Sequence, residues 1–131
     1  PKIDTDMGVR HPLRILVAED NVVNQKLALR ILQQMGYRAD LASNGVEAVE
    51  IFRRTDPDVV TMDITMPHMD GIECVERIVA IKPNILILVI SALADKATAV
   101  EAMEKGANGF LNKPFSDRQL NDALEELLGN A

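Results

Sequence analysis

The sequence predicts an α/β protein with a doubly wound parallel sheet, and three observations lead to that fold class. Short apolar runs alternate five times with segments that repeat apolar residues at helical spacing. The run at residues 85–90 is apolar throughout, which is typical of a strand covered on both faces. Most helical segments also begin at a residue that can cap a helix. Five such units imply parallel strands, right-handed crossovers and helices on both faces of the sheet.

Five segments predict strands because they are short, apolar and mostly rich in β-branched residues. The second is more polar than the others, which is typical of a strand at the edge of a sheet. The third ends on Asp63, where the strand leaves the core, and Pro67 keeps a helix from starting too early. The predicted strands cover residues 15–18, 38–42, 59–63, 85–90 and 109–112.

The helices between these strands are recognised by their ends. Asn21 and Asn44 can each cap the helix that follows, and Gly36 is a natural end for the first helix. Ser116 and Gln119 form a capping box at the start of the last helix, with a hydrophobic staple around it. The predicted helices cover residues 22–35, 45–52, 71–81, 95–105 and 117–128.

Composition limits the class of function. A chain of 131 residues with 47% apolar and 26% charged residues predicts one globular domain. The net charge of −6 argues against nucleic-acid binding, and no apolar run is long enough to span a bilayer. With the lone Cys74 and no signal-peptide pattern, we expect a cytoplasmic location without membrane contact. Residues 1–12 predict a linker or tail before a domain at residues 13–129.

Polar residues gather at the carboxyl ends of the predicted strands, where open α/β sheets place their chemistry. Glu19 and Asp20 follow the first strand, Asp63 ends the third, Ser91 follows the fourth and Lys113 follows the fifth. The opposite ends of the strands carry no comparable set. Periodicity does not reveal the strand order, but the flavodoxin-like order 2-1-3-4-5 is one of two common solutions. That order would bring the three carboxylates together.

This set of residue types suits phosphoryl transfer onto a carboxylate. Three crowded carboxylates repel one another unless a cation lies between them, and oxygen ligands in a partly open site suit magnesium, Mg²⁺. Lys113 supplies a positive point charge and Ser91 a hydroxyl group. The attacking oxygen would then belong to Asp63, with the metal and Lys113 neutralising charge on the transferring group.

From about Leu13 to Leu128 the sequence also resembles the receiver domain of two-component response regulators. The matching motifs agree with that family in order and spacing. The region from Arg14 through Asn24-Gln25 reads most like receivers attached to hybrid sensor histidine kinases. The motifs are Glu19-Asp20-Asn21, Met62-Asp63, Met66-Pro67, Met69-Asp70-Gly71, Ser91-Ala92 and Lys113-Pro114-Phe115.

The resemblance implies a phosphorelay protein in which Asp63 is the phosphoacceptor. The phosphoryl group would come from a phosphohistidine on a sensor histidine kinase or a histidine phosphotransfer protein. The resemblance places Mg²⁺ on Asp20, Asp63 and the backbone carbonyl of Thr65, with Glu19 helping through water. The domain would then be a switch with self-phosphorylation and self-dephosphorylation activity only, rather than a metabolic enzyme.

The resemblance also implies how the switch works. Ser91 would move towards the phosphoryl group, Lys113 would pair with that group, and the Lys113–Pro114 peptide bond would be cis. Phe110 stands where the family often has tyrosine, so the switch ring here lacks a hydroxyl. Together Ser91 and Phe110 would remodel the face formed by the fourth helix, the fifth strand and the fifth helix. An unidentified downstream effector would read that face.

Three alternatives belong to other classes. A receiver-like interaction module that is never phosphorylated would keep the fold without the chemistry. A haloacid-dehalogenase-like phosphatase also uses a nucleophilic aspartate after a parallel strand, but it needs a second acid two residues later, where this chain has Thr65. A Rossmann nucleotide-binding module lacks support because the chain has neither G-x-G-x-x-G nor G-K-[ST].

Overall fold

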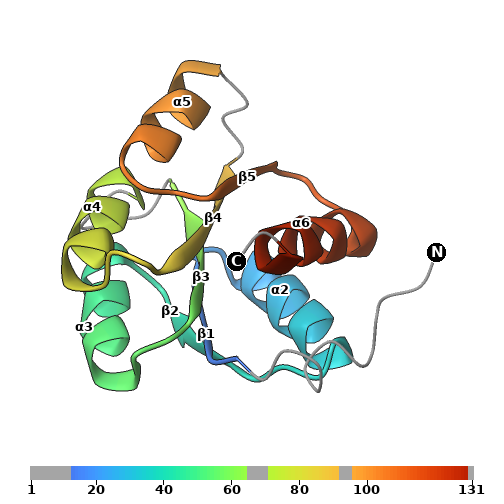
Figure 1. The fold of residues 1–131 in the computed structure, drawn as a ribbon. Helices are drawn as coiled ribbons and strands as arrows, with labels where there is room; N and C mark the ends of the chain where they lie inside the picture. The colour runs from blue at the N-terminus through green and yellow to red at the C-terminus, as the bar shows by residue number, and fades with distance from the viewer. Residues whose placement is uncertain (1–12, 65–70, 92–95, 130–131) are drawn as a thin grey trace.

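The computed structural model describes residues 13–64, 71–91 and 96–129. Their five parallel strands form one sheet in the order β2-β1-β3-β4-β5, which confirms the predicted flavodoxin-like order (Figure 1). The more polar second strand lies at an edge, as predicted. The strands are β1 (Ile15–Ala18), β2 (Ala39–Ala42), β3 (Val59–Asp63), β4 (Leu86–Ser91) and β5 (Gly109–Asn112).

Helices cover both faces of the sheet, because each crossover between parallel strands returns over one face or the other. Helices α2 and α6 lie together on one face, and α3, α4 and α5 lie on the other (Figure 1). The helices are α2 (Val22–Gln34), α3 (Gly45–Thr55), α4 (Gly71–Ile81), α5 (Lys96–Glu104) and α6 (Asp117–Gly129).

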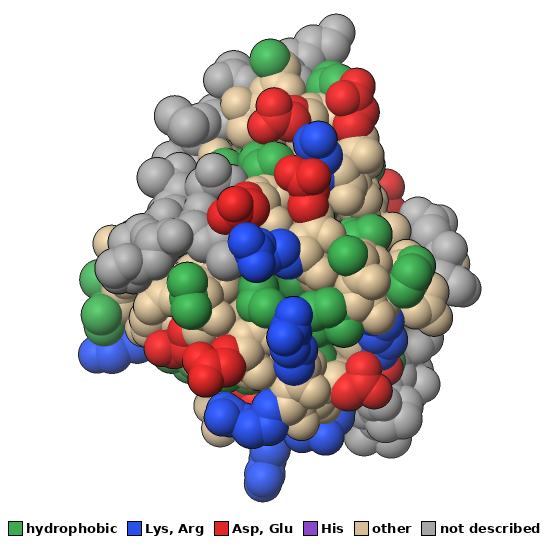
Figure 2. All heavy atoms as spheres, turned by 90° about the vertical axis from the view of Figure 1, so that its left-hand side faces the viewer, with side chains coloured by type: hydrophobic (Ala, Val, Ile, Leu, Met, Phe, Trp, Pro, Cys, Tyr) green, Lys and Arg blue, Asp and Glu red, His purple; other side chains and the backbone are tan. Residues whose placement is uncertain are grey.

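The outer surface on the α3–α4–α5 side carries charges of both signs. Figure 2 shows acidic side chains interspersed with lysines, arginines and apolar groups over the described part of this face. Such a mixture differs from the basic stripe that nucleic-acid-binding domains present. The lack of a basic stripe on the described part of this face agrees with the net charge of −6.

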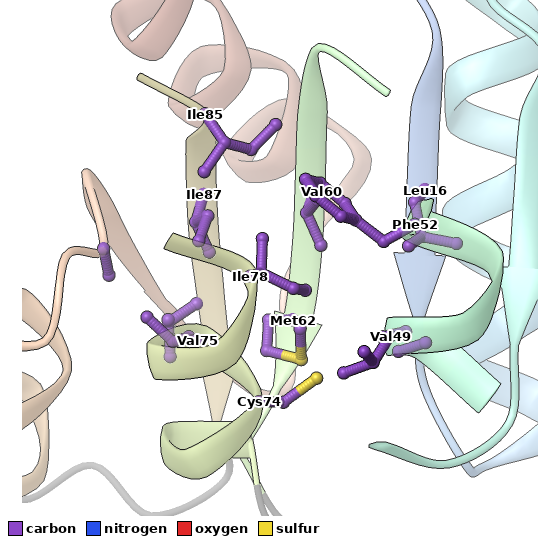
Figure 3. Close-up of a cluster of buried hydrophobic side chains, with 14 of the residues drawn as sticks. Leu16, Val49, Phe52, Val60, Met62, Cys74, Val75, Ile78, Ile85 and Ile87 are labelled. Atoms are coloured by element: carbon purple, nitrogen blue, oxygen red, sulfur yellow. The ribbon is translucent and has the colours of Figure 1, made fainter. Parts of the chain in front are cut away.

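A buried apolar cluster fills the space between the sheet and helices α3 and α4. Its residues come from the strands at the centre of the sheet and from the inward sides of both helices (Figure 3). Each of the larger side chains contributes about 1.5–3 kcal/mol by leaving water. Cys74 belongs to this cluster as a small core residue, and its Sγ donates to the Gly45 carbonyl at 3.6 Å. The labelled members are Leu16, Val49, Phe52, Val60, Met62, Cys74, Val75, Ile78, Ile85 and Ile87.

The predicted helix caps are present wherever the structure describes them. The Asn21 side chain accepts from the Asn24 N–H at 3.1 Å, and that of Asn44 accepts from the Glu47 N–H at 2.8 Å. The last helix has its predicted capping box: the Gln119 N–H donates to Ser116 Oγ at 3.1 Å, and the Ser116 N–H donates to Gln119 Oε1 at 2.8 Å. The staple residues Phe115 and Leu120 are both buried in the core.

The observed boundaries of α2, α6, β2 and β4 differ from the predicted ones by one residue, and those of α3 and α5 also differ. Helix α3 continues three residues past the predicted end at Phe52, to Thr55, and stops where Asp56 adopts a left-handed conformation with φ of 50°. An aspartate tolerates that conformation better than most residues, but it is a weaker signal than glycine. Helix α5 is assigned to Lys96–Glu104 rather than 95–105, and residue 95 lies outside the described ranges.

The amino ends of the strands carry a charged group that the sequence analysis did not expect. Lys82, just after α4, donates to the Pro57 carbonyl at 3.0 Å. Its Nζ also lies 3.3 Å from Asp56 and 3.9 Å from Asp58. We call Asp56, Asp58 and Lys82 the amino-edge cluster. The expectation that this edge holds no comparable set was therefore wrong.

Candidate functional site at the carboxyl edge of the sheet

Strand pairing brings the predicted acids together. Strands β1 and β3 are neighbours, with Ala18 opposite Met62, so Glu19 and Asp63 come next at the same edge. One carboxylate oxygen from each of Glu19, Asp20 and Asp63 lies within 4.8 Å of the other two. The predicted convergence of these three acids is present in the structure.

The three acids differ in exposure. Glu19 and Asp63 are buried, whereas Asp20 is exposed. The Asn21 N–H donates to Glu19 Oε2 at 3.0 Å, which holds that carboxylate in place. The site therefore has a buried floor and is open to solvent on the side of Asp20.

Lys113 reaches these acids from the fifth strand. Its N–H continues the ladder to the Ser91 carbonyl at 2.8 Å, and the Lys113–Pro114 peptide bond is cis, the isomer that the resemblance implied. Its Nζ lies 2.7 Å from Glu19 Oε1 and 3.3 Å from Asp63 Oδ2. We call Glu19, Asp63 and Lys113 the carboxyl-edge cluster. The sequence placed Lys113 at this site but did not reveal its contact with Glu19.

The charge balance favours the protonated lysine. Burial by itself would lower the pKa of Lys113. The hydrogen bond to Glu19 and the negative charges of Asp63 and Glu19 together outweigh burial, so the pKa is raised above its usual value of 10.5. Lys113 therefore remains a cation throughout the physiological range and offsets part of the charge of the acids.

The two predicted switch residues lie on the strands beside this site. Ser91 ends β4 and is fully buried, one residue beyond Ile90, which pairs with Asp63. Phe110 on β5 is half-buried and packs against the apolar cluster on the α3–α4–α5 side. Both residues thus connect the carboxyl edge to the core.

Gly71 is a residue whose role at this site the sequence did not explain. A Cβ at Gly71 would overlap with the carbonyl oxygen of Asp63 and lie 2.5 Å from the Cα of Ile64. The Gly71 N–H donates to the Ile64 carbonyl at 2.7 Å. Helix α4 thus begins directly against the backbone that carries Asp63, which requires a residue without a side chain.

The acidic cluster fits a hard divalent cation. Its three ligand atoms are carboxylate oxygens, which Mg²⁺ prefers, and Asp20 leaves one side open for water or a phosphate oxygen. The loop between β3 and α4 includes Thr65, the expected carbonyl ligand, and Pro67, and both lie outside the described residues. The described residues therefore supply three carboxylate oxygens that could hold a metal ion.

Comparison with known proteins decides the family. The model for the response regulator receiver domain matches residues 15–125, which contain the sheet and the acidic edge. The chain belongs to the response regulator receiver family. Receiver domains act in two-component phosphorelays as signalling switches, and the acidic pocket of Glu19, Asp20 and Asp63 is consistent with aspartate phosphorylation that uses Mg²⁺.

Relatives of this receiver domain include single-domain and multidomain proteins. It is 40% identical to the chemotaxis protein CheY of Thermotoga maritima over 115 residues, covering 87% of this chain and 96% of that protein. It is 33% identical to the hybrid signal transduction histidine kinase K of Dictyostelium discoideum, covering 90% of this chain but only 11% of that longer protein. The receiver domain thus occurs both alone and within larger chains.

Solved structures give the same result. The CheX–CheY–BeF3–Mg complex of Borrelia burgdorferi contains a chain with a TM-score of 0.86 and 31% identity, covering 88% of each chain. The receiver domain of the sensor histidine kinase PA1611 of Pseudomonas aeruginosa, solved with magnesium in its active-site cleft, has a TM-score of 0.81 and 31% identity. It covers 89% of this chain and 98% of that one.

None of the described helices combines the length and apolar character needed to cross a membrane.

Proposed function

We propose that Asp63 is the phosphoacceptor of this receiver domain. The observation that carries the proposal is the placement of a buried Asp63 carboxylate beside Glu19 and Asp20 and within 3.3 Å of Lys113 Nζ. A carboxylate oxygen of Asp63 would form the new P–O bond while the P–N bond to a donor histidine breaks and the imidazole leaves. Because the site opens on the side of Asp20, the donor would approach from there.

The residues around Asp63 would share the work of charge neutralisation. Glu19, Asp20 and Asp63, together with the backbone carbonyl of Thr65, are the proposed holders of Mg²⁺. When bound, the metal would supply positive charge to the phosphoryl oxygens and reduce their repulsion by the acids. Lys113 would turn from the acids to a phosphoryl oxygen, as a point charge can do without fixed geometry.

The switch would act through Ser91 and Phe110. A phosphoryl group adds negative charge and strong hydrogen-bond acceptors at the strand ends. The Ser91 hydroxyl would donate to one of these oxygens, and Phe110 would repack on the apolar cluster beside it. These movements would change the face formed by α5, β5 and α6.

The partners follow from the same chemistry. The donor would be the phosphohistidine of a sensor histidine kinase or a histidine phosphotransfer protein, and a separate effector would bind the altered face. The CheY of Borrelia burgdorferi was solved in complex with CheX, so a related receiver does bind another protein. The self-phosphorylation and self-dephosphorylation activities, and the cytoplasmic location, remain predictions.

Acetyl phosphate provides a direct test of the phosphoacceptor. With Mg²⁺ present, the wild-type chain should gain the mass of one phosphoryl group, and Asp63→Asn should gain none. Asp58→Asn is the matched control, because Asp58 immediately precedes the same strand at its opposite end. Uptake by Asp63→Asn would move the phosphoacceptor elsewhere. If the wild-type chain neither gained a phosphoryl group from acetyl phosphate nor bound beryllofluoride, the result would favour the interaction module that is never phosphorylated.

A further inference from the structure

Gln25 is a buried polar residue on α2 whose side chain reaches the turn that carries the acids. The residue is only 8% exposed, and its Nε2 donates to the Glu19 carbonyl at 2.7 Å. A backbone carbonyl can only accept hydrogen bonds, so the amide nitrogen must face it. The same Nε2 also donates to Ser43 Oγ, at 3.3 Å, in the loop between β2 and α3. The two hydrogens of the amide are thus used by two separate segments of the chain.

Glu19 is held at every polar atom by a different part of the fold. Its N–H donates to the Ala42 carbonyl at 3.0 Å, which extends the pairing with β2 by one residue. Its Oε2 accepts from the Asn21 N–H at 3.0 Å, and its Oε1 lies 2.7 Å from Lys113 Nζ. The carbonyl is the remaining polar atom, and its partner is Gln25.

The hydrogen bond from Gln25 to the Glu19 carbonyl constrains Asp20 as well as Glu19. The carbonyl belongs to the planar peptide unit that ends at the Cα of Asp20. A hydrogen bond to its oxygen therefore fixes the orientation of this peptide plane, and with it the direction in which the Asp20 side chain leaves the backbone. Since Asp20 is exposed, little packing is available to fix its direction. The hydrogen bond from Gln25 thus acts on both acids that follow β1.

We propose that Gln25 is a positioning residue that orients Glu19 and Asp20 for the divalent cation. The inference rests on the proposed metal-assisted function. It adds a residue that touches neither the metal nor the phosphoryl group. Its second bond, to Ser43, ties the acidic turn to the loop before α3. That loop is itself fixed, because the Ser43 N–H donates to Glu47 Oε1 at 3.0 Å.

Metal affinity tests this role. Gln25→Met keeps the length of the side chain but removes both donated hydrogen bonds, and it should weaken Mg²⁺ binding about tenfold, the low end of the range for lost outer-shell partners. Gln33→Met makes the same change on the exposed side of the same helix and should leave the affinity unchanged. Calorimetric titration of the metal-free proteins measures both. Equal affinities for Gln25→Met and wild type would overturn the inference.

A milder variant, Ser43→Ala, tests which of the two hydrogen bonds from Gln25 matters for Mg²⁺ affinity. Ser43→Ala removes only the longer hydrogen bond and leaves the one to the Glu19 carbonyl, so it should keep most of the Mg²⁺ affinity. It also covers the case in which Gln25→Met fails to fold. If Ser43→Ala lost tenfold or more of its Mg²⁺ affinity, the hydrogen bond to the Ser43 loop, rather than the one to the Glu19 carbonyl, would account for metal binding. That result would also overturn the inference.

Hydrogen exchange in the metal-free protein separates positioning from general stability. In Gln25→Met the amides of Glu19 and Asn21 should exchange several-fold faster, because their bonds depend on the geometry of the turn. Amides in the middle of α6 should exchange as in wild type. Uniform acceleration across the chain would show a merely structural role. If the wild-type chain bound no Mg²⁺, the proposed function would fail, while this measurement would still decide whether Gln25 holds the turn.

Discussion

The two edges of the sheet each hold a lysine between two acids, but in different surroundings. In the carboxyl-edge cluster the side chains of Glu19, Asp63 and Lys113 are 7%, 4% and 14% exposed. In the amino-edge cluster the side chains of Asp56 and Asp58 are 79% and 46% exposed, and that of Lys82 is 24% exposed. The distances differ in the same sense, with a shortest Nζ–oxygen ion pair of 2.7 Å at the carboxyl edge and 3.3 Å at the amino edge.

Exposure to solvent, rather than residue type, therefore distinguishes the two clusters. Exposed ion pairs are screened by water and contribute at most about 1 kcal/mol. Buried charges interact more strongly, so the partners of Lys113 raise its pKa even though burial opposes the shift. The amino-edge cluster joins the end of α4 to the start of β3. The carboxyl-edge cluster keeps strong charges within reach of a ligand.

Removing Lys113 should have the largest effect on stability of the changes considered for the two clusters. Lys113→Met leaves Glu19 and Asp63 facing each other without the Lys113 ammonium group. In metal-free buffer the free energy of unfolding should fall by about 2–3 kcal/mol, somewhat below the usual cost of breaking a fully buried pair because the site is partly open. Urea unfolding followed by circular dichroism measures the loss. Saturating Mg²⁺ should recover part of it, and a variant as stable as wild type without metal would show that the two acids do not need Lys113.

Local signals explain how much of the fold could be predicted. The caps at Asn21, Asn44 and Ser116 each bond a group three residues away, so the sequence contains the whole interaction. The strands were recognisable because a parallel sheet covered on both faces requires continuous apolar runs. The end of α3 was missed because Asp56 adopts a left-handed conformation that glycine usually marks.

Contacts between distant segments explain what could not be predicted. Lys82 meets Asp56 and Asp58 only after α4 has folded back across the sheet, so spacing in the sequence gives no sign of the pairing. The hydrogen bond from Gln25 to Glu19 also depends on how α2 packs. The convergence of the acids was predictable because parallel strands place their carboxyl ends at one edge, although the strand order could be given only as one of two common solutions for a doubly wound sheet.

Alkaline pH should remove the contribution of Lys113 without a mutation. Its pKa in the folded chain is raised above 10.5, so its stabilising effect is complete below the unfolded value of about 10.4 and is lost as the pH rises through the folded value. The difference in unfolding free energy between wild type and Lys113→Met should therefore be constant near neutral pH and shrink above about pH 10.5. Subtracting the variant cancels the pH effects that the two proteins share. A difference that shrinks already near neutral pH would contradict the raised pKa.

The smallest expected effect belongs to the amino-edge cluster. Lys82→Met removes two ion pairs with exposed acids and one hydrogen bond to the Pro57 carbonyl, and should lower the free energy of unfolding by about 1 kcal/mol. The ion-pair share should vanish in about 1 M NaCl, where the screening length falls to about 3 Å. The loss from Lys113→Met should mostly persist in the same salt, because the side chains of that cluster are much less exposed than the acids of the amino-edge cluster. Equal salt sensitivity in the two variants would mean that burial does not separate the two edges of the sheet.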